Sequence, residues 1–239
     1  MSNFNYEIDS EIFKDHPEYC RGVVVFKGLN NTNTSPELSE LFREVENKLR
    51  DRVTGNPAEY PMIAAWRNAY KKFGARPADF RSSIEALTRR VVKPDHLPAI
   101  NSLVDIGNLL SLRYVLPAGV HPISSRSKNI MLRKARLGDH FLAELDKEPE
   151  NINDGEIVLA DGSRVLTRRW TWRQAADTRT EVNTECVFFD IDGLNPVDQH
   201  TVESAINDLK DLVKEYCGGV YVGSAVLNMS NPSASFSLD

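Results

Sequence analysis

The chain has 239 residues, 41% of them hydrophobic, and its 29 Lys and Arg against 34 Asp and Glu give a formal net charge of −5. This length and composition predict a folded protein with a sizeable core, and the acidic balance excludes general electrostatic binding to nucleic acid or anionic membranes, so any such contact needs a local basic patch. Three widely spaced cysteines without a C-x-x-C pair predict neither a disulfide framework nor a zinc site.

The first half of the chain is predicted to be one strand followed by helices. Residues 22–26 (GVVVF) form a β-branched run that is typical of a strand. Ser35 and Pro36 are typical of a helix start, and leucines at helical spacing extend that helix to about residue 52. Further helices are expected over residues 60–73, from Ser82 or Ser83 to about 92, and within 98–114.

The second half alternates short apolar runs with turn residues, which predicts strands at 130–135, 155–160, 164–172 and 184–191. A helix is expected between Asn195-Pro196 and Gly218-Gly219, followed by a strand to 227. This order favours an α+β fold without regular β-α-β alternation. We expect a single domain over 1–239, with a strand-helix extension at 1–60 packed on a core at 61–227 and a frayed tail at 228–239.

Positive charge is concentrated between residues 81 and 136, which hold ten Lys or Arg against three acids, whereas 190–217 is acidic. This polarity predicts either a basic face for a polyanion or two merely solvated surfaces. For the first alternative, the predicted RNA contacts are Arg89, Arg90, Lys93, Arg133, Lys134 and Arg136.

Familiar catalytic motifs are absent: the sequence has no Walker A, G-x-G-x-x-G, H-E-x-x-H or G-x-S-x-G pattern. The five histidines lack ligand spacing, so neither a metal nor a cofactor is expected. No secretion signal and no run of 18 apolar residues occurs, which predicts a cytoplasmic protein without a membrane partner.

Two segments carry unusual polar chemistry. In "NSLVDIGNLLSL", helical spacing aligns Asn101, Asp105 and Asn108 as a polar stripe, facing either solvent or a pocket. The segment "RRWTWRQ" (168–174) holds two tryptophans, three arginines and a glutamine. As a strand it would place both tryptophans in the core and the arginines outside, but the polar loop after it also fits a pocket with aromatic walls and hydrogen-bond donors.

The runs "LPAINSLVDIGNLLSLRYVLPAG", "IMLRKARLGDHF", "GEIVLADGSRV" and "NTECVFF" follow one another in an order that resembles the B3/B4 editing domain of the phenylalanyl-tRNA synthetase beta chain, over about residues 63–219. The "W-WRQ" element resembles freestanding B3/B4 proteins. The resemblance implies a three-layer α/β arrangement with a sandwich-like sheet, and hydrolysis of the ester in mischarged aminoacyl-tRNA. The chain has no room for the modules of a complete synthetase.

Site residues follow from the same resemblance. Asn108 matches a pocket asparagine, Gly107 replaces a neighbouring threonine, and Thr184 lies near a pocket wall. His121 stands about two residues out of register with the family's histidine, and the family's glutamate falls at "WTWRQ", where this chain has no acid. The predicted catalytic residues are Asn108, Arg173 and Gln174, and the predicted substrate contacts are Trp172, Thr184, Gly107, His121 and Arg81.

These residues lead to the hypothesis of a trans-editing deacylase that acts on the aminoacylated 3′ end of tRNA and not on DNA. A water positioned by Asn108, Gln174 or the ribose hydroxyl would attack, and Arg173 would stabilise the oxyanion. The alternatives are a non-catalytic amino-acid or RNA-binding module, and a hydrolase or lyase of a free amino-acid-like metabolite. Within 168–174, Trp170 is expected in the core and Arg168 and Arg169 at the surface or facing tRNA. The oligomeric state stays open.

Overall fold

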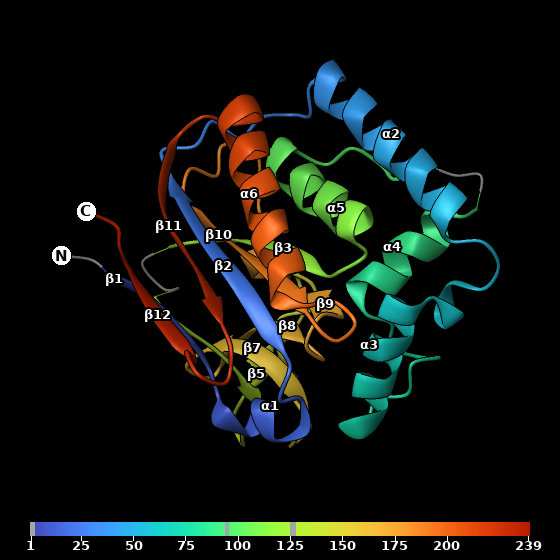
Figure 1. Cartoon of the computed structure of the whole chain (residues 1–239). Helices are drawn as coiled ribbons and strands as arrows, with labels where there is room; N and C mark the ends of the chain where they lie inside the picture. Colours follow the sequence, from blue (N-terminus) through green and yellow to red (C-terminus); the bar gives the residue numbers. More distant parts are fainter. Residues whose placement is uncertain (1–2, 94–95, 125–127) are drawn as a thin grey trace.

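Two β-sheets stacked face to face, with helices outside the smaller one, organise the chain (Figure 1). A computed structural model describes residues 3–93, 96–124 and 128–239. Asp95 and Arg126, which belong to the basic segment, lie outside the described residues. The layers are therefore a helical layer, a small sheet and a large sheet, which confirms the predicted α+β fold.

The small sheet is antiparallel and has four strands in the order β11 (Val220–Leu227), β2 (Cys20–Lys27), β10 (Val187–Gly193) and β3 (Ala118–Pro122). Helices α5 (Ser102–Tyr114) and α6 (Gln199–Tyr216) cover one face of it. The α6 helix packs closely because Gly22 has no side chain: a Cβ there would lie 2.8 Å from Ile206 Cδ1. The face of β2 and β10 that is turned away from the large sheet is thus covered by helices.

The large sheet has eight strands, and its strand order is β12 (Ser233–Ser237), β1 (Asn3–Ile8), β4 (Asn129–Lys134), β7 (Ile157–Asp161), β8 (Arg164–Arg168), β5 (His140–Phe141) and β6 (Glu150–Asn151), with β9 (Arg173–Gln174) paired to β8. Aromatic rings join it to the small sheet, with Phe4 and Phe188 centroids 5.0 Å apart. The expectation of a frayed tail is wrong, because β12 pairs with β1 and buries Phe236.

The remaining helices are α1 (Ser10–Asp15), α2 (Pro36–Arg52), α3 (Pro61–Lys72) and α4 (Ser83–Val91), with short 3-10 turns η1 (Pro57–Glu59) and η2 (Ala176–Thr178). The predicted caps are present: Ser35 accepts from Leu38 N at 3.2 Å and Ser82 from Glu85 N at 3.4 Å. No helix in the described parts of the chain combines the length and apolar character needed to cross a membrane.

The N-terminal segment is built into both sheets. Its strand β1 lies between β12 and β4 in the large sheet, and β2 lies between β11 and β10 in the small one. Residues 3–60 are therefore part of the layered core, in contrast to the expected extension packed on it. One consequence is that β2 delivers a residue, Arg21, to the pocket described next.

Candidate functional site

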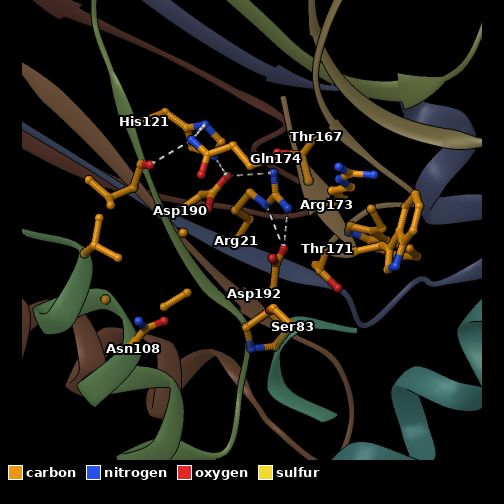
Figure 2. Close-up of a pocket in the computed structure, with 18 residues that line it drawn as sticks. Arg21, Ser83, Asn108, His121, Thr167, Thr171, Arg173, Gln174, Asp190 and Asp192 are labelled. Atoms are coloured by element: carbon orange, nitrogen blue, oxygen red, sulfur yellow. Dashed lines mark hydrogen bonds and ion pairs between the residues drawn. The ribbon is translucent and has the colours of Figure 1, made fainter. Parts of the chain in front are cut away.

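A pocket of about 190 Å³ opens between α5, strands β2, β3 and β10 of the small sheet, and the turn that follows β8 (Figure 2). Of the predicted catalytic and substrate-contacting residues, six line it: Gly107, Asn108, His121, Trp172, Arg173 and Gln174. They come from α5, β3 and the β8–β9 region, which only the fold brings together. The roles predicted for them stay predictions.

The other two predicted substrate contacts lie elsewhere. The Thr184 hydroxyl accepts a hydrogen bond from Glu181 N at 3.0 Å in the loop before β10. The Arg81 side chain is 47% exposed and lies 3.9 Å from the Glu85 carboxylate. Neither residue lines the pocket, although Ser83, two positions after Arg81, does.

The segment 168–174 is a strand end and a sharp turn, so the prediction of one continuous strand is wrong. Strand β8 stops at Arg168, and Arg169 and Trp170 have φ values of 45° and 65°, in the left-handed region. The chain then returns as β9, where Arg173 pairs with Arg168. Both tryptophans line the pocket: Trp170 is buried, as expected, and Trp172 is half-buried.

Arg168 and Arg169 are buried, which corrects the expectation of a surface or tRNA-facing position. Arg168 donates from Nε and Nη2 to the two oxygens of Glu156, at 2.9 and 3.0 Å. The Arg169 guanidinium lies 3.7 Å from the Phe80 ring centroid and 4.6 Å from that of Trp172. Both arginines therefore support the wall that holds Trp172.

The pocket floor is an ion-paired cluster of Arg21, Asp190 and Asp192 (Figure 2). Arg21 and Asp192 face each other across β2 and β10, and Arg21 Nε donates to Asp192 Oδ1 at 2.7 Å. Tyr19 also donates its hydroxyl proton to Asp192. Burial raises the pKa of Asp192 to about 6, whereas the ion pair with Arg21, at 2.7 Å, favours its charged form.

His121 lies beside this floor and is neutral at pH 7. It is buried and stacks on Phe188, with centroids 4.9 Å apart. Burial lowers its pKa, and Arg21 lowers it further, although Asp190 acts in the opposite direction. The Gln174 amide nitrogen lies 3.1 Å from Nδ1 of the ring. Because an amide nitrogen donates and does not accept, this contact favours the tautomer with its proton on Nε2, which lies 3.7 Å from Asp190.

Sequence reasoning missed Arg21, Asp190 and Asp192. A signal for the two acids exists in "FFDIDG", where charged residues alternate with apolar ones along a strand that is otherwise buried. Their face of β10 cannot be plain core, because buried charges need partners. Nothing comparable in "CRGVVVF" distinguishes Arg21 from a residue at the start of a solvent-facing strand.

Only part of the proposed polar stripe on α5 reaches the pocket. Asn101 caps the helix by accepting from Val104 N at 3.1 Å, and Asp105 accepts from Ile100 N at 3.2 Å. Both are buried. Asn108 is half-buried and lines the pocket, and its side chain makes no hydrogen bond with the residues that the structure describes. It is therefore the member of the stripe that can contact a ligand.

The predicted RNA contacts fall into two groups. Arg89, Arg90 and Lys93 lie at the end of α4, where Arg89 pairs with Glu85 at 2.9 Å and the other two are exposed. The second group lies on and after β4: Arg133 is buried in a bidentate pair with Asp139, Lys134 lies 3.7 Å from Glu11, and Arg136 lies 3.5 Å from Asp9. The burial of Arg133 removes support for its predicted phosphate contact.

In the described ranges, no three His, Cys, Asp or Glu side chains converge as ligands for a metal ion. The floor supplies two carboxylates, but Arg21 lies between them, with its Nη1 3.4 Å from Asp190 and its Nη2 2.7 Å from Asp192. The two carboxylates therefore share one guanidinium, with Asp192 hydrogen-bonded to it and Asp190 at a longer distance.

Fold and pocket together define an α+β sandwich domain with a pocket between the small sheet, helix α5 and the β8–β9 region of the large sheet. The model of the B3/4 domain family matches residues 65–218, so the chain belongs to that family. Among solved structures, it is similar to an N-terminal fragment of the phenylalanyl-tRNA synthetase beta-subunit from Pyrococcus horikoshii, with 14% identity, a TM-score of 0.44, and coverage of 92% of this chain and 49% of that one. The chain thus spans about half of that fragment. No curated protein matches it.

Proposed function

We propose that the chain binds tRNA and hydrolyses the ester of a mischarged aminoacyl-tRNA. The observation that carries the proposal is that Asn108, His121 and Arg173, from three separate elements, line one pocket of a B3/4 domain. The sequence resemblance of this B3/4 domain to the editing domain of a tRNA synthetase makes tRNA the partner we expect.

The pocket offers donors to a reacting ester. The His121 Nε2–H, the free Asn108 amide and the Arg173 guanidinium can each stabilise the oxyanion that forms when water attacks the carbonyl carbon. Collapse of that intermediate breaks the bond to the ribose oxygen, which takes up a proton as it leaves. This route needs no covalent enzyme intermediate, because an aminoacyl ester is already activated and positioning supplies much of the rate.

Exposed cations on one side of the pocket support a path for the tRNA. The α4 helix begins at Ser83 in the pocket lining, and it is preceded by Arg81 and ends near Arg90 and Lys93, all three exposed. Phosphates of a 3′ strand that follows α4 would meet these side chains before the terminal adenosine reaches the pocket.

A non-catalytic binding module is the second candidate, and one observation favours it. The Gln174 side-chain nitrogen, which was predicted to act in catalysis, already donates to Val120 O at 3.2 Å and to Thr178 O. Its two N–H groups are therefore shared between these carbonyls and His121, and they hold the pocket wall in place.

The deciding experiment follows release of labelled amino acids from a panel of correctly and incorrectly charged tRNAs. We expect release for at least one mischarged tRNA, with a loss of about 100-fold in Asn108→Ala and Arg173→Ala, the size typical of a lost oxyanion donor. Arg179→Ala, an exposed arginine outside the pocket lining, is the matched control. Absence of release for every charged tRNA would exclude the hydrolase and leave the binding module.

A further inference from the structure

The buried charges of the pocket floor do not balance. Asp190 and Asp192 are 5% and 2% exposed, and Arg21, which is 1% exposed, is the cation that lies between them. His121 adds no charge, because its ring is neutral. The floor therefore carries a net charge of −1, and an unneutralised charge in a buried site is costly.

The excess charge belongs to Asp190. Arg21 directs Nε and Nη2 to Asp192, and Nη1 donates to the Tyr6 hydroxyl, so Asp190 Oδ2 stays at 3.4 Å from Nη1. Among the described residues, no donor forms a hydrogen bond with the Asp190 carboxylate. This carboxylate lines the pocket and has free acceptor sites there.

The strand opposite leaves room for this carboxylate. Gly119 pairs with Asp190 across β3 and β10, and a Cβ at position 119 would lie 2.5 Å from Asp190 Oδ1. Any larger residue at position 119 would force this carboxylate to move. The other cation of the lining, Arg173, lies beyond Arg21 as seen from Asp190 in Figure 2, and its Nη2 donates to Ala143 O at 3.3 Å.

We propose that Asp190 accepts the ammonium group of the ligand, so that the site takes only ligands with a free primary amine. An ammonium supplies three donors and the missing positive charge, whereas a neutral hydroxyl would supply a donor alone. This inference rests on the proposed function for its substrate class: aminoacyl esters with an unblocked α-amine are accepted, and N-acylated or peptidyl esters are rejected.

The test compares two stable ligands on the wild-type protein by calorimetry. Each probe is an adenosine that carries alanine, serine or tyrosine through a 3′-amide in place of the ester, either with a free amine or N-acetylated. We expect the free-amine form of at least one pair to bind about 10- to 100-fold more tightly, as for other charge-assisted hydrogen bonds. The comparison changes only the ligand, so it does not depend on the folding of a variant.

The Asp190→Asn variant tests whether the preference for the free-amine probe depends on the Asp190 carboxylate. It keeps the side-chain shape and leaves Arg21 balanced by Asp192, and we expect it to bind the two forms of a probe within about threefold of each other. Asp211→Asn, an exposed change on α6, is the control and should keep the wild-type preference.

The outcomes separate this proposal from the proposed function. Equal wild-type binding of free and acetylated probes, or binding of neither, would overturn the role of Asp190, even if charged tRNA is still deacylated. A preference for the free amine without release from any tRNA would support Asp190 and exclude the hydrolase. Lost turnover with unchanged probe affinity in Asp190→Asn would overturn the proposal by assigning Asp190 to proton transfer.

Discussion

Two clusters in this molecule pair buried arginines with carboxylates, but they differ in charge balance and in access to the pocket. Beside β8, Arg168 and Arg169 contact Glu156, and Arg168 also pairs with Glu150 at 2.8 Å, so two cations meet two anions. On the pocket floor, one cation, Arg21, meets two carboxylates, and one of these faces an open cavity. The first cluster is balanced in charge and holds a wall, although Arg169 Nη1 has no hydrogen-bond partner among the described residues, whereas the second has one carboxylate in excess, beside the cavity. Charge balance and access therefore distinguish a structural cluster from a site.

The largest expected effect is on stability, from Arg21→Met. This change leaves two buried carboxylates without a cation, and we expect a loss of about 3–5 kcal/mol in the free energy of unfolding. Urea denaturation measures it. Arg168→Met should cost less, about 2 kcal/mol, because Arg169 stays 3.4 Å from Glu156 and Glu150 is half-exposed. Equal losses in the two variants would remove the distinction between the clusters.

A smaller loss is expected from Tyr19→Phe, which alters the support of the floor without changing its charge. The Tyr19 hydroxyl donates to Asp192 and accepts from Trp170 Nε1 at 3.2 Å. Its removal leaves the buried Trp170 Nε1–H unsatisfied and takes one of the donors from Asp192, which keeps Arg21, at a cost of about 1–3 kcal/mol in urea denaturation. Tyr221→Phe, at an exposed tyrosine, is the matched control and should stay within about 0.5 kcal/mol of wild type.

The pH dependence of stability tests the neutral state of His121. Burial lowers its pKa from 6.5, so the folded protein binds this proton less readily than the unfolded chain. The free energy of unfolding therefore loses nothing to His121 above pH 6.5, the ordinary histidine pKa. It decreases as the pH falls below that value, with a limiting slope of about 1.4 kcal/mol per pH unit. Asp192, whose pKa is raised, acts in the opposite direction between its ordinary value of 3.8 and about 6.

Because the two groups act in opposite directions, the contribution of His121 is measured as the difference in stability between wild type and His121→Gln. Stability curves of wild type and His121→Gln between pH 7.5 and pH 5, a window set by the histidine titration, should diverge as the pH falls, with the wild type losing more. His200→Gln, at an exposed histidine on α6, should run parallel to wild type. Parallel curves for His121→Gln would mean that the fold does not shift the pKa of this ring. Divergence in the opposite sense, with the wild type gaining stability as the pH falls toward 6.5, would mean that the ring is protonated in the folded state, and the floor would then be balanced without a ligand.

The smallest expected effects are on the affinity for tRNA and its dependence on salt concentration. If α4 guides the tRNA, Arg90→Ala should reduce the slope of log affinity against log salt by about 0.7–0.9, the value for one lost phosphate contact. Lys134→Ala, on β4 and beside Glu11, should change it less. A fluorescence titration at several salt concentrations measures both, and an equal change in the two variants would contradict a path along α4.

Local sequence signals determined much of the fold. Caps and leucine spacing predicted α2, and proline and glycine signals bounded α6, because these elements depend on residues within a few positions of one another. The approximate strand positions in the second half followed from β-branched runs. Asn108 and the 172–174 segment were also predicted as site residues, with the resemblance to the B3/B4 editing domain deciding where their polar pattern left a solvent-facing or core position open; their roles stay predictions.

The tertiary structure decided the rest, for reasons of distance along the chain. Arg21 and Asp192 are 171 residues apart and meet only because β2 and β10 pair. Arg169 and Trp170 take left-handed backbone angles that their side chains do not favour, and the burial of Trp170 against Trp66, 5.1 Å between centroids, compensates. The sequence by itself determined which elements form and which polar residues stand out. The packing of the two sheets decided which charges are paired and which one faces the pocket.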